Sequence, residues 1–293
     1  MRGAGPFVEV ADGVFHGRYR QWDVGVGLVV GSEAALVVDT RASEVQGREV
    51  VEDIRRMGLG VPVTTVVCTH VHFDHTFGNR AFAEATIHAH QRVLETYESD
   101  AERLKARVRA ETEVGPDESY SAQDLKDVLA AVPRRPDLTF STTKQVDLGD
   151  RAVELAFAGR GHTDGDIRIA VPDAGVVFLG DLVEESAPPS LGTDSWPLDW
   201  AVTLDRHLAA IGSDALVLPG HGRPVDAAFV RRQRDELAAV AAVIRDRHAA
   251  GIPLVQARQE PDGRLPYPLD WLASAFTRGY AQAGERADGE YRP

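Results

Sequence analysis

A run of β-branched residues, VTTVVCT at positions 63–69, leads directly into the histidine-rich stretch HVHFDH. A continuous apolar run of this length is typical of a strand that is buried on both faces. Such strands favour a layered protein in which sheets and helices cover one another. Similar runs occur in AALVVD, VVFLGD and LVLPGH, and each of these also ends in an aspartate or a histidine.

Two segments of the chain repeat the same order of expected elements. In the first, a strand runs into Asp39, a helix follows through EVQGREVVEDIRRMG, and the next strand ends at His70. In the second, a strand runs into Asp181, a helix follows, and the next strand ends at His221. We therefore expect two similar β-rich halves with polar side chains at the carboxyl ends of buried strands. Layered proteins place ligand sites at that edge.

Local signals predict further elements. FVEVADGVFHGRY predicts a hairpin that turns at Asp12 and Gly13. Ser43 is expected to cap the first helix, with Val51, Ile54 and Met57 roughly on one face. After the histidine cluster we expect the strand ATIHAH, and strands resume at AVELAFA, IRIAV and GVVFLG.

The region 91–132 is rich in Glu, Arg, Lys, Asp and Ala and predicts one or two helices, broken around EVGPDES. We expect it to be a helical insertion, and two roles for it stay open: a lid over a substrate or a peripheral decoration. Residues 226–293 predict a helical C-terminal extension. A length of 293 residues is compatible with one domain, so we expect a single domain over 1–293.

Composition narrows the class of partner. A formal net charge of -13 argues against nucleic acid and against an anionic membrane surface. Cys68 is the only cysteine, which excludes a disulfide framework and thiolate metal clusters, and we expect it to pack inside its strand. The N-terminus lacks the apolar run of a signal peptide, so we expect a cytoplasmic protein. The expected partner is a small-molecule substrate, and a homodimer is left open.

Potential metal ligands gather in CTHVHFDHTFGN, residues 68–79. Residues two apart on an extended segment point the same way, so His70 and His72 can hold one ion. Asp74 and His75 lie just beyond the strand and can turn toward a second ion. Imidazole and carboxylate donors without thiolate suit Zn²⁺, with Fe or Mn as alternatives.

Three further donors lie downstream, each in a loop or at the end of an apolar strand. They are His162 in GRGHTDGD, Asp181 in VVFLGD and His221 in LVLPGH. His88 and His90 also alternate on a strand, but they lack further partners, so we expect them on a solvent-facing edge. Trp196 and Trp200 follow Asp181 and are expected either to pack in the core or to line a pocket.

From about residue 7 to residue 225 this series of motifs resembles the metallo-β-lactamase superfamily, with H-x-H-x-D-H, GHTDGD, FLGD and PGHG in the family's order. The resemblance implies an α+β fold, a four-layer αββα sandwich with two metal ions at one edge. It also implies a first metal on His70, His72 and His162, a second on Asp74, His75 and His221, Asp181 bridging the two, and Asp39 supporting them.

The resemblance implies a hydrolase. Two Zn²⁺ ions that share a water would supply a bridging hydroxide, and Asp74 is expected to hold it as the catalytic residue. A carboxylate at position 181 resembles the hydroxyacylglutathione hydrolase and lactonase branches, so we expect an ester, thioester or lactone substrate. The run DLVEES lacks the tyrosine of quorum-quenching lactonases. The alternatives are a β-lactamase-type amide hydrolase, an iron-dependent oxygenase or redox protein, and a non-catalytic binding module.

Overall fold

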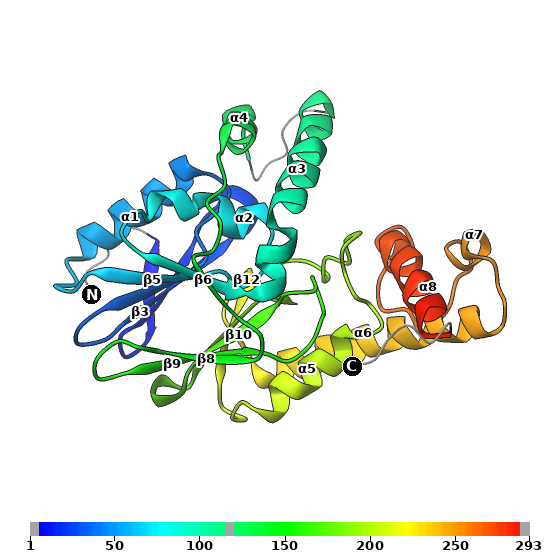
Figure 1. Ribbon diagram of the computed structural model, residues 1–293. Helices are drawn as coiled ribbons and strands as arrows, with labels where there is room; N and C mark the ends of the chain where they lie inside the picture. Colours follow the sequence, from blue (N-terminus) through cyan, green and yellow to red (C-terminus); the bar gives the residue numbers. More distant parts are fainter. Residues whose placement is uncertain (1–5, 115–119, 288–293) are drawn as a thin grey trace.

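The computed structural model describes residues 6–114 and 120–287. Two mixed β-sheets pack face to face, and helices cover the outer side of each sheet (Figure 1). This α+β arrangement confirms the predicted four-layer αββα fold. The predictions for residues 1–5 and 288–293, at the two ends of the chain, lie outside the described residues.

The first sheet contains seven strands that lie in sequence order. They are β1 (Phe7–Ala11), β2 (Val14–Arg18), β3 (Gly25–Val30), β4 (Ala35–Val38), β5 (Val63–Val67), β6 (Thr86–His90) and β7 (Leu138–Phe140). Strands β1 to β4 pair antiparallel, whereas β4 to β7 pair parallel. The predicted hairpin is present between β1 and β2, and Gly13 takes the left-handed backbone conformation that its turn requires (φ 64°).

The second sheet has six strands in the order β13-β12-β11-β10-β9-β8. They are β8 (Thr143–Asp147), β9 (Ala152–Phe157), β10 (Ile167–Val171), β11 (Val176–Glu184), β12 (Leu216–His221) and β13 (Val225–Asp226). The predicted strands AVELAFA, IRIAV and GVVFLG correspond to β9, β10 and β11. Strands β7 and β8 were not predicted, because most of their side chains are at least partly exposed and leave little apolar pattern.

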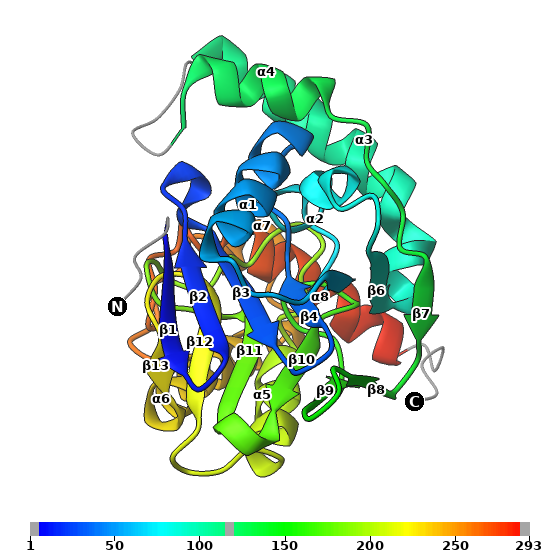
Figure 2. The ribbon, with the colours of Figure 1, turned by 90° about the vertical axis from the view of Figure 1, so that its left-hand side faces the viewer.

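The helices lie outside the sheets or beyond their edges. They are the 3₁₀ turns η1 (Gln21–Asp23), η2 (Phe77–Ala81) and η3 (Pro172–Ala174), and the helices α1 (Glu44–Met57), α2 (Phe73–Thr76), α3 (Gln91–Val114), α4 (Ala122–Ala130), α5 (Trp200–Ala209), α6 (Ala227–Ala249), α7 (Leu254–Ala257) and α8 (Ala273–Ala287). Helices α1 to α3 lie on the side of the first sheet and α5 and α6 on the side of the second (Figure 1). Figure 2 shows α3 and α4 together above the first sheet. No helix of the described ranges is both long and apolar enough to cross a membrane.

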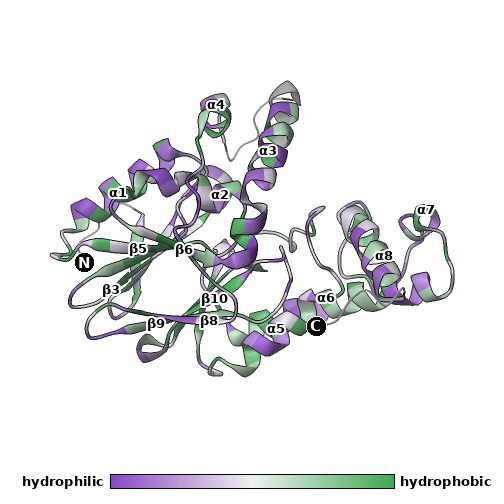
Figure 3. Cartoon of the chain, in the orientation of Figure 1, coloured by the Kyte–Doolittle hydropathy of each residue, from purple (hydrophilic) through white to green (hydrophobic). Residues whose placement is uncertain are grey.

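Three apolar clusters hold these layers together. One lies between the sheets and includes Leu36, Val67, Ile169 and Phe178. The second joins the first sheet to α1 and α3, and the third joins the second sheet to α5, α6 and α8. Figure 3 shows the same distribution, with hydrophobic colour on the strands and hydrophilic colour on α1 and α3. Each sheet is therefore buried on both faces, as its continuous apolar strands predict.

Helix α1 begins and ends as predicted. The Ser43 hydroxyl accepts a hydrogen bond from the Gln46 backbone N–H at 3.3 Å, and Gly58 ends the helix in the left-handed conformation. Of the three residues expected on one face, Ile54 is buried but Val51 is 36% exposed, and Val50 is buried beside Ile54. Gly47 fixes this rotation, since a Cβ there would lie 2.5 Å from the Gly78 carbonyl oxygen.

The two predicted halves contain the same type of connection, a parallel pair of strands joined by a helix. Strands β4 and β5 pair parallel across α1, and strands β11 and β12 pair parallel across α5. In each pair, the first strand leads to or contains an aspartate (Asp39 after β4, Asp181 within β11), and the second leads to or ends at a histidine (His70, His221). The carboxyl ends of parallel strands lie at one edge of a sheet, which places these four residues at the same edge of the sandwich.

Helices α3 and α4 occupy most of the predicted insertion 91–132. The predicted break at EVGPDES falls mainly on residues 115–119, outside the described residues. Helices α6 and α8 form most of the described C-terminal extension, and they pack against one another.

The solvent-facing prediction for His88 and His90 is wrong, because both side chains are buried. Strand β7 pairs with the outer side of β6, so β6 is an inner strand. The His90 Nε2–H donates to the Ser141 carbonyl oxygen at 3.0 Å, and its ring stacks on Phe157 with centroids 3.9 Å apart. Cys68 is fully buried in its strand end, as predicted.

Of the two tryptophans, Trp200 is fully buried, and its indole N–H donates to the Leu182 carbonyl oxygen at 3.2 Å. Trp196 lies between the guanidinium groups of Arg160 and Arg278, which sit 3.6 and 4.9 Å from its ring centroid. Both tryptophans therefore have a packing role.

Buried neutral histidines make the fold sensitive to acid. Burial, and then Arg168, lowers the pKa of His207 to about 3, and burial, and then Lys144, lowers the pKa of His88 to about 4. Below pH 6.5 the unfolded chain binds protons at these positions that the folded chain does not. In metal-free protein we expect the free energy of unfolding to fall by about 1.4 kcal/mol per pH unit for each histidine between pH 6.5 and pH 4.

Urea unfolding of the chelator-treated protein at several pH values measures this slope. His207→Leu removes one titrating group. The slope of its unfolding free energy against pH should therefore correspond to about one bound proton fewer below pH 6.5, with no change of slope above pH 7. An unchanged slope below pH 6.5 would contradict the assignment of His207.

Candidate metal centre

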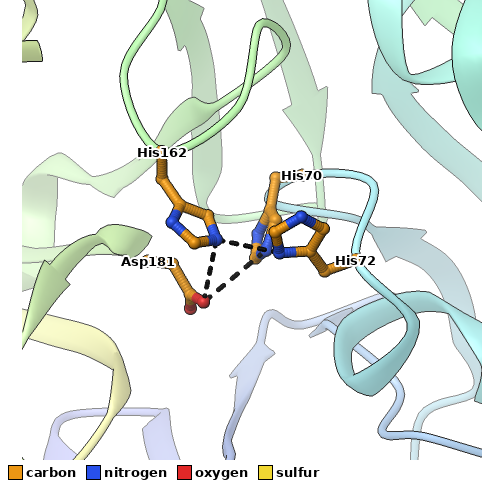
Figure 4. A group of neighbouring side chains, drawn as sticks. All are labelled: His70, His72, His162 and Asp181. Atoms are coloured by element: carbon orange, nitrogen blue, oxygen red, sulfur yellow. Dashed lines mark hydrogen bonds and ion pairs between the residues drawn. The ribbon is translucent and has the colours of Figure 1, made fainter. Parts of the chain in front are cut away.

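All seven predicted ligands converge where the strands β5, β11 and β12 end. The structure sorts them into two groups whose donor atoms lie within 4.8 Å of one another: His70, His72, His162 and Asp181 in the first, and Asp74, His75 and His221 in the second. Figure 4 shows the first group, with three imidazole rings turned toward the Asp181 carboxylate. Their assignment as metal ligands stays a prediction, and their geometry tests whether they fit one.

In the first group, the closest contact joins His72 Nδ1 and His162 Nε2 at 2.8 Å (Figure 4). Asp181 Oδ2 lies 3.3 Å from His162 Nε2 and 3.7 Å from His70 Nε2. These atoms come from the segment after β5, from the loop between β9 and β10, and from β11. Three stretches of sequence therefore surround one small volume.

In the second group, His75 Nε2 and His221 Nε2 lie 3.4 Å apart, and Asp74 Oδ2 lies 3.6 and 3.4 Å from them. The Asp181 carboxylate also reaches this group, with Oδ1 3.2 Å from His75 Nε2 and Oδ2 3.3 Å from His221 Nε2. Asp181 is the residue in contact with histidines of both groups, the position that a bridging ligand occupies.

Every histidine in the two groups uses its remote ring nitrogen in a separate hydrogen bond. The bonds are His70 Nδ1 to Thr69 Oγ1 (3.0 Å), His72 Nε2 to Asp194 (2.8 Å), His75 Nδ1 to Asp39 (2.8 Å), His162 Nδ1 to the Ser190 carbonyl (3.0 Å) and His221 Nδ1 to the Trp22 carbonyl (2.7 Å). Carbonyl and carboxylate oxygens only accept, and the Thr69 hydroxyl already donates to Asp39, so the remote nitrogens donate. The near nitrogens of neutral rings then point their lone pairs at the centre.

This arrangement fits metal ions. His70 Nε2 and Asp181 Oδ1 are buried and make no protein hydrogen bond. Two imidazole lone pairs facing one another at 2.8 Å, as in His72 and His162, repel unless a cation lies between them. Nitrogen and oxygen donors of this kind suit Zn²⁺, and also Fe or Mn.

Electrostatics show what a metal must displace. Burial raises the pKa of Asp181, but the surrounding imidazoles of His221, His75, His70 and His162 outweigh burial and hold it well below its ordinary value. Burial lowers the pKa of His221, but Asp181 and Asp74 outweigh it and raise that pKa to about 10. Without metal, protons on imidazole therefore balance the buried carboxylate, and metal binding would release them.

Asp39 organises the underside of the centre, in agreement with its expected supporting role. Its carboxylate accepts from the Thr69 backbone N–H and hydroxyl and from His75 Nδ1–H, each at 2.8 Å. Asp39 has φ 62° and Trp22 has φ 55°, a strained conformation for residues other than glycine. Both residues orient histidines of the second group, so the strain lies where the ligand geometry is set.

The glycine in PGHG has a steric reason. A Cβ at Gly220 would lie 1.9 Å from Asp181 Oδ1, so any side chain there would push the shared carboxylate away. Gly180, just before Asp181, has φ 50°, and a Cβ there would lie 2.7 Å from the Thr69 side chain. The glycines beside Asp181 and His221 therefore let the two strands approach at the centre.

Sequence reasoning missed the partners of four rings, which are Thr69, Asp194, Ser190 and Trp22. Asp194 lies in the loop after β11, accepts from His72, and also accepts from Arg103 Nη2 of α3 at 2.7 Å. Ser190 and Trp22 contribute backbone carbonyl oxygens, and such contacts cannot be predicted from residue type. The Pro/Ser-rich composition of the loop was the available signal, and it marks a loop without marking a contact.

A cavity of about 810 Å³ opens above the centre. Its lining includes Asp74, His162, Asp181 and His221 together with Trp22, Phe73, Leu191, Asp194 and Trp271. The predicted insertion contributes Arg103, Leu104, Val108 and Tyr120. The insertion therefore forms part of the wall around the candidate ligands.

Comparisons with known proteins agree with this geometry. The family profile described as the metallo-beta-lactamase superfamily matches residues 21–233. The chain is 27% identical over 214 residues to the metallo-beta-lactamase type 2 of Bacillus cereus, covering 72% of each chain. It is also 27% identical over 230 residues to the acyl-coenzyme A thioesterase MBLAC2 of Homo sapiens, covering 72% of this chain and 79% of the relative.

Among solved structures, the chain resembles the stereoselective inverting sec-alkylsulfatase Pisa1 from Pseudomonas sp., with a TM-score of 0.74 at 18% identity. The match covers 98% of this chain but 51% of the sulfatase, so this chain spans about half of that protein. At this identity the likeness concerns the fold.

Removing the shared charge tests the bridge. Asp181→Asn keeps the shape of the side chain but removes the charge that the predicted bridge would need to hold two cations close together. We expect loss of about one of two metal equivalents and a fall in kcat of at least about 100-fold, the upper end of what outer hydrogen-bond partners of metal ligands cost. Elemental analysis and initial rates measure both. The same substitution at Asp173, a half-exposed partner of Arg151, should leave them unchanged. Full metal content and activity in Asp181→Asn would show that Asp181 is not a ligand.

Asp194→Asn tests the outer hydrogen bond to His72. The amide oxygen still accepts, but the negative charge that makes the imidazole a better donor to a cation is lost. We expect about 10-fold weaker zinc affinity at one of two sites, measured by competition with a chelator, with the other site at parental affinity. Asp173→Asn again serves as control, and parental affinity at both sites would contradict an orienting role for Asp194.

Proposed function

Because the chain belongs to the metallo-beta-lactamase superfamily, we propose that it is a dinuclear zinc-dependent hydrolase of a carboxylic ester, thioester or lactone. The family and the hydrolases among its relatives support a metal-dependent hydrolase. One observation carries the finer proposal: imidazole lone pairs in two groups converge on the Asp181 carboxylate, which contacts both.

When bound, two divalent ions at such a centre would supply hydroxide near neutral pH and stabilise negative charge that develops on a carbonyl oxygen. The protein's own residues orient the reactants. Asp74 lines the cavity and contacts His75 and His221 through Oδ2, and these contacts support a role in which its carboxylate would accept a hydrogen bond from the attacking water. We assign Asp74 this catalytic role.

We also propose that the insertion 91–132 covers the centre. Four of its residues line the cavity, and Arg103 bonds Asp194, which in turn bonds the candidate ligand His72. A cover of this kind contacts the substrate and excludes water without binding metal.

The relatives do not distinguish between a β-lactam and a thioester substrate, since the lactamase and the thioesterase are both 27% identical to this chain. A carboxylate at position 181 supports acyl ester chemistry over β-lactam cleavage, as in the lactonase and hydroxyacylglutathione hydrolase branches that the sequence resembles. The lactamase relative makes β-lactam cleavage the second candidate. The metal content of the purified protein distinguishes the two chemistries, since zinc would indicate hydrolysis and iron would indicate oxygenase chemistry.

One experiment tests the proposal. Protein purified without added metal should carry close to two zinc ions per chain by elemental analysis. It should then hydrolyse members of a panel of 4-nitrophenyl esters, acyl thioesters and lactones, and lose that activity on chelation. The same panel contains β-lactams and alkyl sulfates. Hydrolysis of those two classes alone, or iron with dioxygen uptake, would overturn the proposal.

A further inference from the structure

The cavity above the candidate ligands has an apolar wall that the metal chemistry does not use. We define it as Trp22, Phe73, Leu104, Val108 and Tyr120, and all five line the cavity. Resting on the function proposed above, we propose that this wall binds an uncharged apolar chain on the acyl part of the ester or thioester. The centre would then select acyl groups of medium length.

Aromatic contacts build the wall from two distant segments and α2. Trp22 and Tyr120 stack with ring centroids 5.1 Å apart and an interplanar angle of 14°. Phe73 meets Trp22 edge-on at 5.4 Å and 90°. All three side chains are half-buried and pack against the apolar cluster that includes Phe77 and Leu125. Their supported faces can bury an apolar chain, which gains free energy in proportion to the area removed from water.

The wall starts beside the reacting centre. The Trp22 carbonyl accepts the Nδ1–H of His221 at 2.7 Å, and Phe73 stands between His72 and Asp74 in the sequence. A chain attached to a carbonyl held at the centre therefore meets these rings within the same cavity. Longer chains can extend along Leu104 and Val108, which lie four residues apart and so share one face of α3.

The charges in the cavity favour an uncharged chain. Among the described lining residues, Arg103 is the single lysine or arginine, and its guanidinium already bonds Asp100 and Asp194. The other charged lining side chains beyond the candidate ligands are carboxylates, Asp23, Glu184 and Asp194. A phosphate-bearing group, such as coenzyme A, would find no uncommitted cation on this described lining. An apolar chain needs none.

A chain-length series tests the wall. We expect kcat/KM for 4-nitrophenyl esters to rise about 4-fold per methylene from acetate to octanoate, the gain expected for burying each group. Tyr120→Ala should lower the octanoate-to-acetate ratio of kcat/KM about 10-fold, whereas Tyr120→Phe, which keeps the ring, should preserve it. Tyr267→Ala removes a tyrosine that bonds Glu236 in another pocket and should keep the parental ratio.

The outcomes separate the two levels of the proposal. Ester hydrolysis with a flat chain-length profile would overturn the acyl wall and leave the hydrolase proposal standing. No hydrolysis of any ester or thioester would overturn the hydrolase proposal itself. Metal content and circular dichroism establish that each variant is folded. If Tyr120→Ala does not fold, Val108→Ser, which makes the wall polar, replaces it, and a parental ratio in that variant overturns the inference.

A thioester pair tests the charge argument separately. Octanoyl-N-acetylcysteamine and octanoyl-coenzyme A carry the same acyl group, but the second adds phosphates. We expect the uncharged thioester to have a kcat/KM equal to or above that of the coenzyme A ester. A value more than about 10-fold higher for the coenzyme A ester, lost in high salt, would show a cationic subsite and overturn the uncharged class.

Discussion

A buried carboxylate encircled by imidazoles is the interaction on which the rest of this structure depends. Asp181 is 4% exposed, and a carboxylate taken out of water costs several kcal/mol unless cations or hydrogen bonds compensate it. Here histidine nitrogens provide the surroundings, and Asp181 Oδ1 makes no hydrogen bond of its own. The compensation has to be cationic, either protons on imidazole or metal ions. The hydrogen bonds to the remote ring nitrogens leave the near nitrogens free to face such a cation.

The sandwich brings these groups together through its connections. Parallel pairs open their carboxyl ends at one edge, so β4 with β5 and β11 with β12 deliver two aspartates and two histidines there. The apolar cluster between the sheets sets the distance between these edges. An isolated antiparallel β-bridge pairs Val24, just before β3 of the first sheet, with His221, at the end of β12 of the second sheet. This bridge joins the two sheets at the candidate metal centre. The packing of the layers therefore also sets the geometry of the site.

The sequence predicts the donors better than their surroundings. The apolar strands ending in aspartate or histidine, and the motif order around His70 and His162, were sufficient to name all seven residues that converge. Strands β7 and β8 were missed because their exposed side chains carry little periodicity, and that omission misplaced His88 and His90 at an edge. The partners of the rings were missed for another reason. A carbonyl at Trp22 or a carboxylate at Asp194 becomes a partner only through tertiary placement.

The histidines of the centre have supports of two kinds, and the kind depends on where the supporting residue lies. His75 of the second group leans on Asp39, which is buried beneath the strand ends and holds Thr69 as well. His162 and His72 of the first group lean on the loop after β11, through an exposed serine's carbonyl and through Asp194, which helix α3 shares. The Trp271 indole N–H donates to Pro189 of that loop, so the C-terminal extension braces it. The core of the sandwich thus sets the orientation of His75, whereas the orientation of His72 and His162 depends on the segments that also wall the cavity.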